Sequence, residues 1–325
     1  MASRPSIQPE NKSGQSPSAG RRSPGGKLLL WFKIVRPQTL FASACPVLVG
    51  WKLSSALTGQ TNAAVAWLTL CCALALQILS NLINDYYDFR RGADNKGRQG
   101  FKRALAEGTV SEGQIRRACL AALTVAVLTG AVLVWTGGWP ILIIGLTALL
   151  FAWLYTATDY SLSYLGIADV FVLLYYGLLA CWGTVWLQQA SAWPWTETWL
   201  QLNLSLPDSL GEKALLAGGV NGLISMCVLA INNLRDIQDD RAVNKKTFPV
   251  RFGKKAALAG LGIIVLLMPL AAWLSLGPSL ALLVVVPALF LYYKVLTSSG
   301  AQYNGCLLMA GLTNAVYTAL VWISL

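Results

Sequence analysis

Long apolar runs separated by short polar segments dominate the chain from residue 28 onward. The runs show no strict alternation of apolar and polar positions, so they favour helices over the strands of a membrane β-barrel. A helix needs roughly 20 apolar residues to cross a bilayer. We therefore predict about nine transmembrane helices, at 28–56, 63–84, 114–134, 139–158, 165–188, 212–233, 255–275, 279–296 and 303–323.

The first apolar run contains two prolines and follows a polar N-terminal segment. It contains Pro37 and Pro46, so we expect it to kink or to begin at the membrane interface. The residues before it, 1–26, are polar and rich in Ser, Pro and Gly, which predicts a disordered cytoplasmic tail. Residues 27–325 then form one transmembrane domain.

The composition supports a membrane protein. Of the 325 residues, 55% are hydrophobic and only 12% are charged, about half the charged fraction of a soluble domain. Because only helices and closed barrels satisfy the backbone in lipid, we predict an all-α polytopic membrane protein embedded in the lipid bilayer.

The positive charges predict an orientation. With the N-terminus in the cytoplasm, the nine spans place all but two of the 25 Lys and Arg residues on the cytoplasmic side, the exceptions being Lys52 and Lys213. This bias is typical of cytoplasmic loops and predicts the orientation of the spans. We expect the membrane to be a bacterial cytoplasmic (inner) membrane. The basic residues lie beside membrane spans, so the net charge of +11 does not indicate nucleic-acid binding.

The sequence also restricts the chemistry. There is no histidine, the most common general base and metal ligand. The seven cysteines lie in or beside apolar runs without metal-ligand spacing, and we interpret them as small core residues. Catalysis would have to depend on carboxylates, tyrosines or a substrate that ionises by itself.

Two short acidic segments end apolar runs on the predicted cytoplasmic side. They read NLINDYYDFRRGAD at 81–94 and NNLRDIQDDRAVNKKTFPVRFG at 232–253, and they hold six of the 14 acidic residues. Asn81 and Asp85 are four positions apart, as are Asn84 and Asp88, and Asn232, Asp236 and Asp240 form a ladder of fours. We therefore expect a stripe of oxygen ligands on one face of each helix. Oxygen ligands suit Mg²⁺, which usually binds one or two carboxylates together with substrate phosphates. Arg and Lys residues follow each segment and suit phosphate oxygens.

Two other interpretations of these segments remain. Asp and Asn could simply cap helix ends in contact with water. An ion-coupled transporter also uses membrane carboxylates, but those usually lie near mid-helix or in discontinuous helices.

The same segments resemble the two Asp-rich motifs of the UbiA superfamily of intramembrane prenyltransferases. Within it, NDYYDFRRGAD, YT at 155–156, YLGIAD at 164–169 and NNLRDIQDDRAVNKKTFPVRFG are most similar to the branch that prenylates 1,4-dihydroxy-2-naphthoate in menaquinone biosynthesis. Many members have Asp where this chain has Gly92, and Asp94 matches the arrangement of the menaquinone branch. YLGIAD also departs from the usual LGD of that branch.

The resemblance implies a ligand set for Mg²⁺ and two substrates, an isoprenoid diphosphate and an aromatic acid. The metal ligands and catalytic carboxylates would be Asp88, Asp94, Asp236 and Asp240. Tyr155 would stabilise an allylic cation through its ring. The remaining substrate-binding residues would be Asn81, Asn84, Asp85, Arg103, Asp169, Asn232, Asn233, Arg235, Lys245 and Arg251.

The implied reaction is decarboxylating prenyl transfer. The C–O bond of a polyprenyl diphosphate breaks, the electron-rich naphthoate ring attacks the allylic cation, and loss of carbon dioxide and a proton restores aromaticity, giving demethylmenaquinone. Another quinone head group as acceptor, or phytyl as donor, stays open. Tail length and oligomeric state stay open as well.

Overall fold

The computed structural model describes all residues except 1–23, 93–99, 101–102, 158–160, 201–205 and 207–208. All regular structure in the described residues is helical. The longer helices are α1 (Pro24–Val35), α2 (Pro37–Thr58), α3 (Ala63–Arg90), α4 (Glu112–Leu154), α7 (Leu179–Ala190), α9 (Leu210–Arg235), α11 (Phe248–Leu276), α12 (Val285–Thr297) and α13 (Tyr303–Ser324). The shorter elements are α5 (Leu162–Leu165), α6 (Ala168–Leu173), the π-turn η1 (Leu174–Leu178), α8 (Trp195–Leu200), α10 (Ile237–Ala242), and the 3₁₀ turns η2 (Leu280–Val284) and η3 (Gly300–Gln302).

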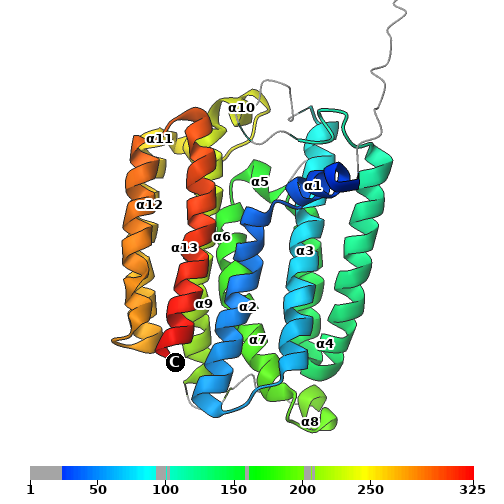
Figure 1. The fold of residues 1–325 in the computed structure, drawn as a ribbon, viewed down its shortest axis with the longest axis vertical. Coiled ribbons are helices and arrows are strands. Elements are labelled where there is room, and N and C mark those ends of the chain that lie inside the picture. Colours follow the sequence, from blue (N-terminus) through cyan, green and yellow to red (C-terminus); the bar gives the residue numbers. More distant parts are fainter. Residues whose placement is uncertain (1–23, 93–99, 101–102, 158–160, 201–205, 207–208) are drawn as a thin grey trace, which may run out of the picture.

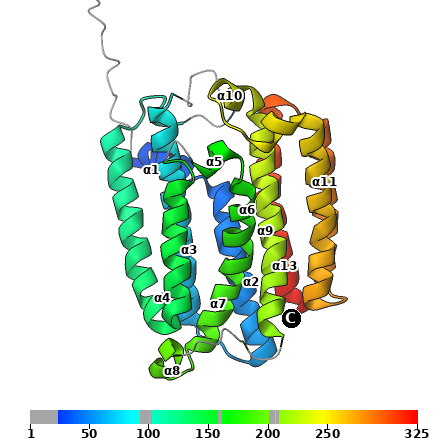
Figure 2. The same ribbon diagram turned by 180° about the vertical axis from the view of Figure 1, so that it is seen from behind.

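The long helices run side by side in one bundle (Figure 1). Among the described residues, eight helical segments are long and apolar enough to cross a membrane. One of them, α4, has 43 residues and contains the non-helical Gly138, with φ 70°. There α4 folds back into two antiparallel arms (Figure 2), so it holds both predicted spans, 114–134 and 139–158. The prediction of an all-α polytopic fold with about nine spans is confirmed.

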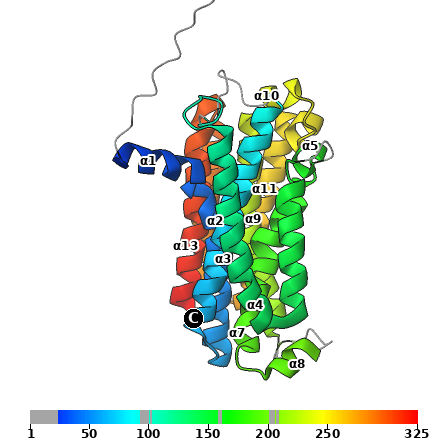
Figure 3. The same ribbon diagram turned by 90° about the vertical axis from the view of Figure 1, so that its right-hand side faces the viewer.

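The first predicted span is divided at Pro37, whereas Pro46 lies inside α2. Arg36 adopts φ 58°, α1 ends just before it, and Pro37 is the first residue of α2. Proline suits that position because its missing N–H would have no intrahelical partner there. Helix α1 consequently lies crosswise at one end of the bundle (Figure 3). The predicted disordered tail falls largely on residues 1–23, outside the described residues, and stays a prediction.

Helix α9 is the centre of the main core, and small residues let its neighbours approach closely. A Cβ on Gly177 of η1 would lie 2.7 Å from the Gly218 carbonyl oxygen and from the Gly222 Cα. Such close backbone contact is typical of helix pairs in membranes. It fixes the π-turn against α9, and π-turns are frequent at functional sites.

Both acidic segments lie at the same end of the bundle. The end of α3, the short α5 and α10 gather there, while α8 and the C-terminus lie at the opposite end (Figure 1). The two segments, about 150 residues apart in sequence, thus meet in space. Which side of the membrane this end faces stays a prediction from the charge distribution.

Candidate active site

A cavity of about 680 Å³ extends into the bundle from the end that carries the acidic segments. Its walls come mainly from α2, α3, both arms of α4, η1 and α7. The polar lining residues toward that end include Arg36, Asn81, Asn84, Arg103, Asn232 and Arg235. Most of the other lining residues are apolar or aromatic. The cavity therefore suits an amphiphilic ligand with an anionic head and an apolar tail.

One side of the polar end is built around Asp85. This carboxylate is buried and forms ion pairs with Arg36 and Arg103. One turn earlier on α3, Asn81 donates to the Val35 carbonyl oxygen at 3.1 Å and to the Thr39 hydroxyl at 2.9 Å. Asn81 and Asp85 thus hold the junction between α1 and α2, and Arg36 and Arg103 place guanidinium donors at the cavity.

A second group joins the two acidic segments through one ammonium. Lys245 Nζ lies 3.6 Å from Asp88 Oδ1 and 3.9 Å from Asp240 Oδ1. Asp88 is 2% exposed, and its Oδ1 has no hydrogen-bond donor among the described residues. Two carboxylates from different helices therefore face the same small volume.

The end of α9 holds the third group. Arg235 donates from Nε to Asp236 Oδ1 at 2.7 Å and from Nη2 to Asp236 Oδ2 at 2.8 Å. The same guanidinium also binds Asn232 at 2.6 Å and Asn304 at 2.7 Å. Helix α9 ends at Arg235 and α10 begins after Asp236. The predicted Asn232, Asp236, Asp240 ladder is therefore divided between two helices.

The segment around α5 connects these groups. The ring of Tyr164 has the Arg91 guanidinium 5.0 Å from its centroid and the Lys245 ammonium 5.1 Å from it. Arg91 also donates to the Thr156 carbonyl oxygen, and the Thr156 hydroxyl donates to Asn84 at 2.9 Å. Burial raises the pKa of the Tyr164 phenol, although both cations lower it. Tyr164 is thus neutral near pH 7, and its ring contacts are cation–π interactions.

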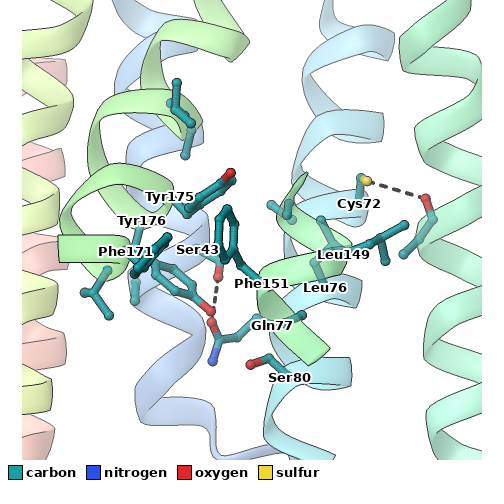
Figure 4. Close-up of a pocket in the computed structure, with 18 of the residues that line it drawn as sticks. Ser43, Cys72, Leu76, Gln77, Ser80, Leu149, Phe151, Phe171, Tyr175 and Tyr176 are labelled. Carbon is teal, nitrogen blue, oxygen red and sulfur yellow. Dashed lines mark hydrogen bonds between the residues drawn. The ribbon is translucent and has the colours of Figure 1, made fainter. Parts of the chain in front are cut away.

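Below the polar end, aromatic side chains line part of the cavity (Figure 4). Phe151 of α4 lies 4.4 Å from Phe171 and 5.3 Å from Tyr175, measured between ring centroids. The π-turn brings consecutive residues Tyr175 and Tyr176 to the cavity. Ring faces attract cations, so this wall suits a positively charged intermediate.

The described residues supply part of a ligand set that suits Mg²⁺. Asp88 and Asp240 offer oxygen ligands to one volume, and the buried Asp88 Oδ1 has coordination capacity left. Within the described part of the chain no three His, Cys, Asp or Glu residues cluster as a metal site. Two carboxylates suffice for Mg²⁺ when substrate phosphates and water complete the shell. The predicted ligand Asp94 lies outside the described residues.

The other predicted site residues are placed as follows. Tyr155 follows α4 and lines the cavity. Asp169 lies in the first turn of α6. Neither it nor Asn233 lines the cavity, and the carboxylates of Asp85, Asp88, Asp236 and Asp240 and the ammonium of Lys245 are likewise not among its lining residues. Arg251 is exposed and donates to the Leu165 carbonyl oxygen at 2.7 Å, so it holds α5 instead of reaching the cavity.

Sequence reasoning missed three residues of this end. Arg36 precedes Pro37 at the expected break, which was a signal for a special position. Arg91 belongs to the first acidic segment, but its charge was counted only toward orientation. Tyr164 lies within the YLGIAD stretch, and no local pattern shows that its ring contacts two cations.

Fold and site together define a helical membrane protein whose cavity can hold an anionic head group above an apolar tail. The model of the UbiA prenyltransferase family matches residues 43–310. The chain belongs to the UbiA prenyltransferase family and is a membrane prenyltransferase.

Individual proteins agree with this assignment. The chain is 32% identical to the 1,4-dihydroxy-2-naphthoate octaprenyltransferase of Escherichia coli, over 69% of this chain and 68% of that protein. It is 31% identical to the enzyme of the same name from Mycobacterium leprae, over 76% and 80% of the two chains. A UbiA homologue from Archaeoglobus fulgidus, solved with GPP and Mg²⁺, shares the fold with a TM-score of 0.60 and 17% identity, covering 90% of this chain and 98% of that one.

Proposed function

We propose that the protein transfers a polyprenyl group from polyprenyl diphosphate to 1,4-dihydroxy-2-naphthoate, with loss of carbon dioxide, giving demethylmenaquinone. The observation that carries the proposal is the cavity, whose polar end lies between two acidic segments and whose deeper walls are apolar and aromatic. Identities of 31–32% to two enzymes of that name support the choice of acceptor.

The diphosphate would lie at the polar end. Arg235 and Arg103 line that end, and Lys245 lies between the carboxylates of Asp88 and Asp240. Charge-assisted hydrogen bonds from such cations to phosphate oxygens are among the strongest in proteins. Asn84 and Asn232 line the same region and can donate through their amides. Mg²⁺ held by Asp88 and Asp240, with Asp94 and Asp236 as further ligands, would neutralise the charge that develops on the leaving group.

The isoprenoid chain would extend into the apolar part of the cavity. Once the C–O bond breaks, the allylic cation must be kept from water, and the wall of Phe151, Phe171 and Tyr175 excludes water while offering ring faces. Tyr155 lines the cavity beside the acidic end and serves the same purpose. No nucleophilic side chain or histidine is needed.

The acceptor ring supplies the electrons for the new C–C bond. Its carbon attacks the allylic carbon, pyrophosphate leaves with the electron pair of the broken C–O bond, and carbon dioxide and a proton leave the ring. The predicted orientation puts this end of the bundle on the cytoplasmic side of the inner membrane, where water-soluble aromatic acids and pyrophosphate can exchange.

A panel of acceptors tests the proposal. Purified protein in detergent receives radiolabelled geranylgeranyl diphosphate and Mg²⁺ with 1,4-dihydroxy-2-naphthoate, 4-hydroxybenzoate or homogentisate. We expect labelled quinol, pyrophosphate and carbon dioxide only with the naphthoate.

The other outcomes are distinct. Product with another acceptor would replace the naphthoate assignment, and a phytyl diphosphate arm would reveal a different donor preference. Pyrophosphate release in none of the arms, together with uptake of a labelled solute into vesicles, would favour the transporter interpretation and refute the proposal.

A further inference from the structure

The α5 segment contributes Leu162 to the cavity lining and contacts both acidic segments. Its Tyr164 carbonyl oxygen accepts the Lys246 N–H at 2.9 Å, and its Leu165 carbonyl oxygen accepts Arg251 at 2.7 Å. Gly166 has φ 71°, and its α-carbon packs so closely on the Lys246 carbonyl that a side chain would collide there. The segment is therefore fixed to the chain that follows α10.

Tyr164 adds a second connection, made by its side chain. Its ring contacts Arg91, which follows α3, and Lys245, which follows α10, at nearly equal distances. Those two cations belong to different acidic segments. The ring thus joins the two acidic segments close to Asp88 and Asp240.

The position of Lys245 depends on this ring. A lysine side chain has four rotatable bonds, and without the ring its ammonium can move toward water. With the ring beside it, the ammonium lies 3.6 Å from Asp88 Oδ1 and 3.9 Å from Asp240 Oδ1. Arg91 is restrained in the same way, with its guanidinium bound to the Thr156 carbonyl oxygen.

We propose that Tyr164 is a positioning residue for the diphosphate site, holding Lys245 and Arg91 through its ring face so that both act on phosphate oxygens. Tyr164 itself need not contact the substrate. The inference rests on the diphosphate assignment of the proposed function and is independent of the acceptor.

Two variants separate the ring from the hydroxyl. Tyr164→Phe keeps the ring face and removes the hydroxyl, whereas Tyr164→Leu removes the ring and keeps an apolar side chain. We expect Tyr164→Leu to raise the KM for prenyl diphosphate about tenfold. We expect Tyr164→Phe to change the KM by only about threefold, since it loses the hydrogen bond from Arg91 to the hydroxyl while its ring still attracts both cations. Tyr293→Leu is the matched control, because Tyr293 is exposed on α12, away from the site.

Binding is measured without turnover as well. Isothermal titration with inorganic pyrophosphate, with and without Mg²⁺, gives the affinity of each variant in detergent. Tyr164→Leu is expected to bind pyrophosphate about tenfold more weakly, while its KM for the acceptor changes less than twofold. A purely structural role would instead lower the active fraction and thus kcat, with KM and pyrophosphate affinity unchanged.

A double-mutant cycle tests whether Tyr164 acts through Lys245. In a Lys245→Met background, the effect of Tyr164→Leu on pyrophosphate affinity should shrink to about threefold, because only Arg91 remains to be positioned. An undiminished tenfold effect in that background would overturn the inference, as would a loss in Tyr164→Phe equal to that in Tyr164→Leu. If wild-type protein binds no pyrophosphate, the diphosphate assignment itself is wrong, which is a separate result.

Discussion

Replacing Lys245 with Met should destabilise the substrate-free protein and make it more responsive to Mg²⁺. Lys245 is the ammonium between Asp88 and Asp240, and all three side chains are at most 12% exposed. At about 4 Å and an effective dielectric constant of 20, each pair contributes about 4 kcal/mol of attraction before desolvation is counted. Removing one partner of such a buried group typically costs about 3–5 kcal/mol, because the carboxylates are left uncompensated.

Thermal unfolding in detergent measures the effect. A loss of about 3–5 kcal/mol corresponds to a fall in Tm of about 5–10 °C in the Lys245→Met variant without metal. Mg²⁺ at a hundred times its Kd raises the free energy of unfolding by about 2.7 kcal/mol. In the wild type, the cost of displacing the Lys245 ammonium offsets part of this stabilisation. We therefore expect Mg²⁺ alone to raise the Tm of the variant by about 5 °C and that of the wild type by less than half as much.

The control is Lys255→Met, which removes an exposed lysine from α11. It should leave both the Tm and the Mg²⁺ response unchanged. The reasoning is refuted if Mg²⁺ stabilises the wild type and the Lys245→Met variant equally, since the ion and the ammonium would then not share the carboxylates of Asp88 and Asp240.

Three further predictions concern the site and its orientation. Asp88→Ala or Asp236→Ala should lower turnover more than about hundredfold while membrane insertion persists, measured by the radiolabel assay and by membrane fractionation; activity in both would contradict the metal assignment. Gly166→Ala should displace α5, because Gly166 has φ 71° and an added Cβ would collide with the Lys246 carbonyl oxygen. We expect the KM for prenyl diphosphate to rise at least about fivefold. An unchanged KM would count against the close contact. In a cysteine-free background, a cysteine in place of Glu197 in α8 should react with an impermeant maleimide on intact cells, and one in the α3–α4 connection should not; the reverse labelling would invert the orientation.

The apolar runs predicted most of the fold, because span length and helix type follow from the thickness of a bilayer. The fold-back of α4 at Gly138 agrees with the division of this stretch into two predicted spans, 114–134 and 139–158. The small-residue contact between Gly177 and α9 was not predictable, because it depends on which helices become neighbours.

The site was predicted in its residue types but less well in its pairings. Spacing of four grouped Asn84 with Asp88 and Asn81 with Asp85. In the structure, Asn84 contacts Thr156 and Asp88 contacts Lys245, whereas Asn81 and Asp85 both contact the junction between α1 and α2. Spacing does not reveal that a helix ends, as α9 does at Arg235. Nor can it show which cation from a distant segment reaches which carboxylate, since that depends on the arrangement of the bundle.

The pairings suggest why metal and diphosphate should bind together. In the structure, Asp85, Asp88 and Asp236 are each compensated by a cation from the protein. A diphosphate that took Lys245 alone would leave buried carboxylates without compensation, and Mg²⁺ alone would displace that ammonium from them. With both ligands present, Asp88 and Asp240 would hold Mg²⁺ and Lys245 would bind phosphate oxygens, so each ligand would lower the cost of binding the other. Reciprocity then requires that Mg²⁺ tighten pyrophosphate binding by the same factor by which pyrophosphate tightens Mg²⁺ binding.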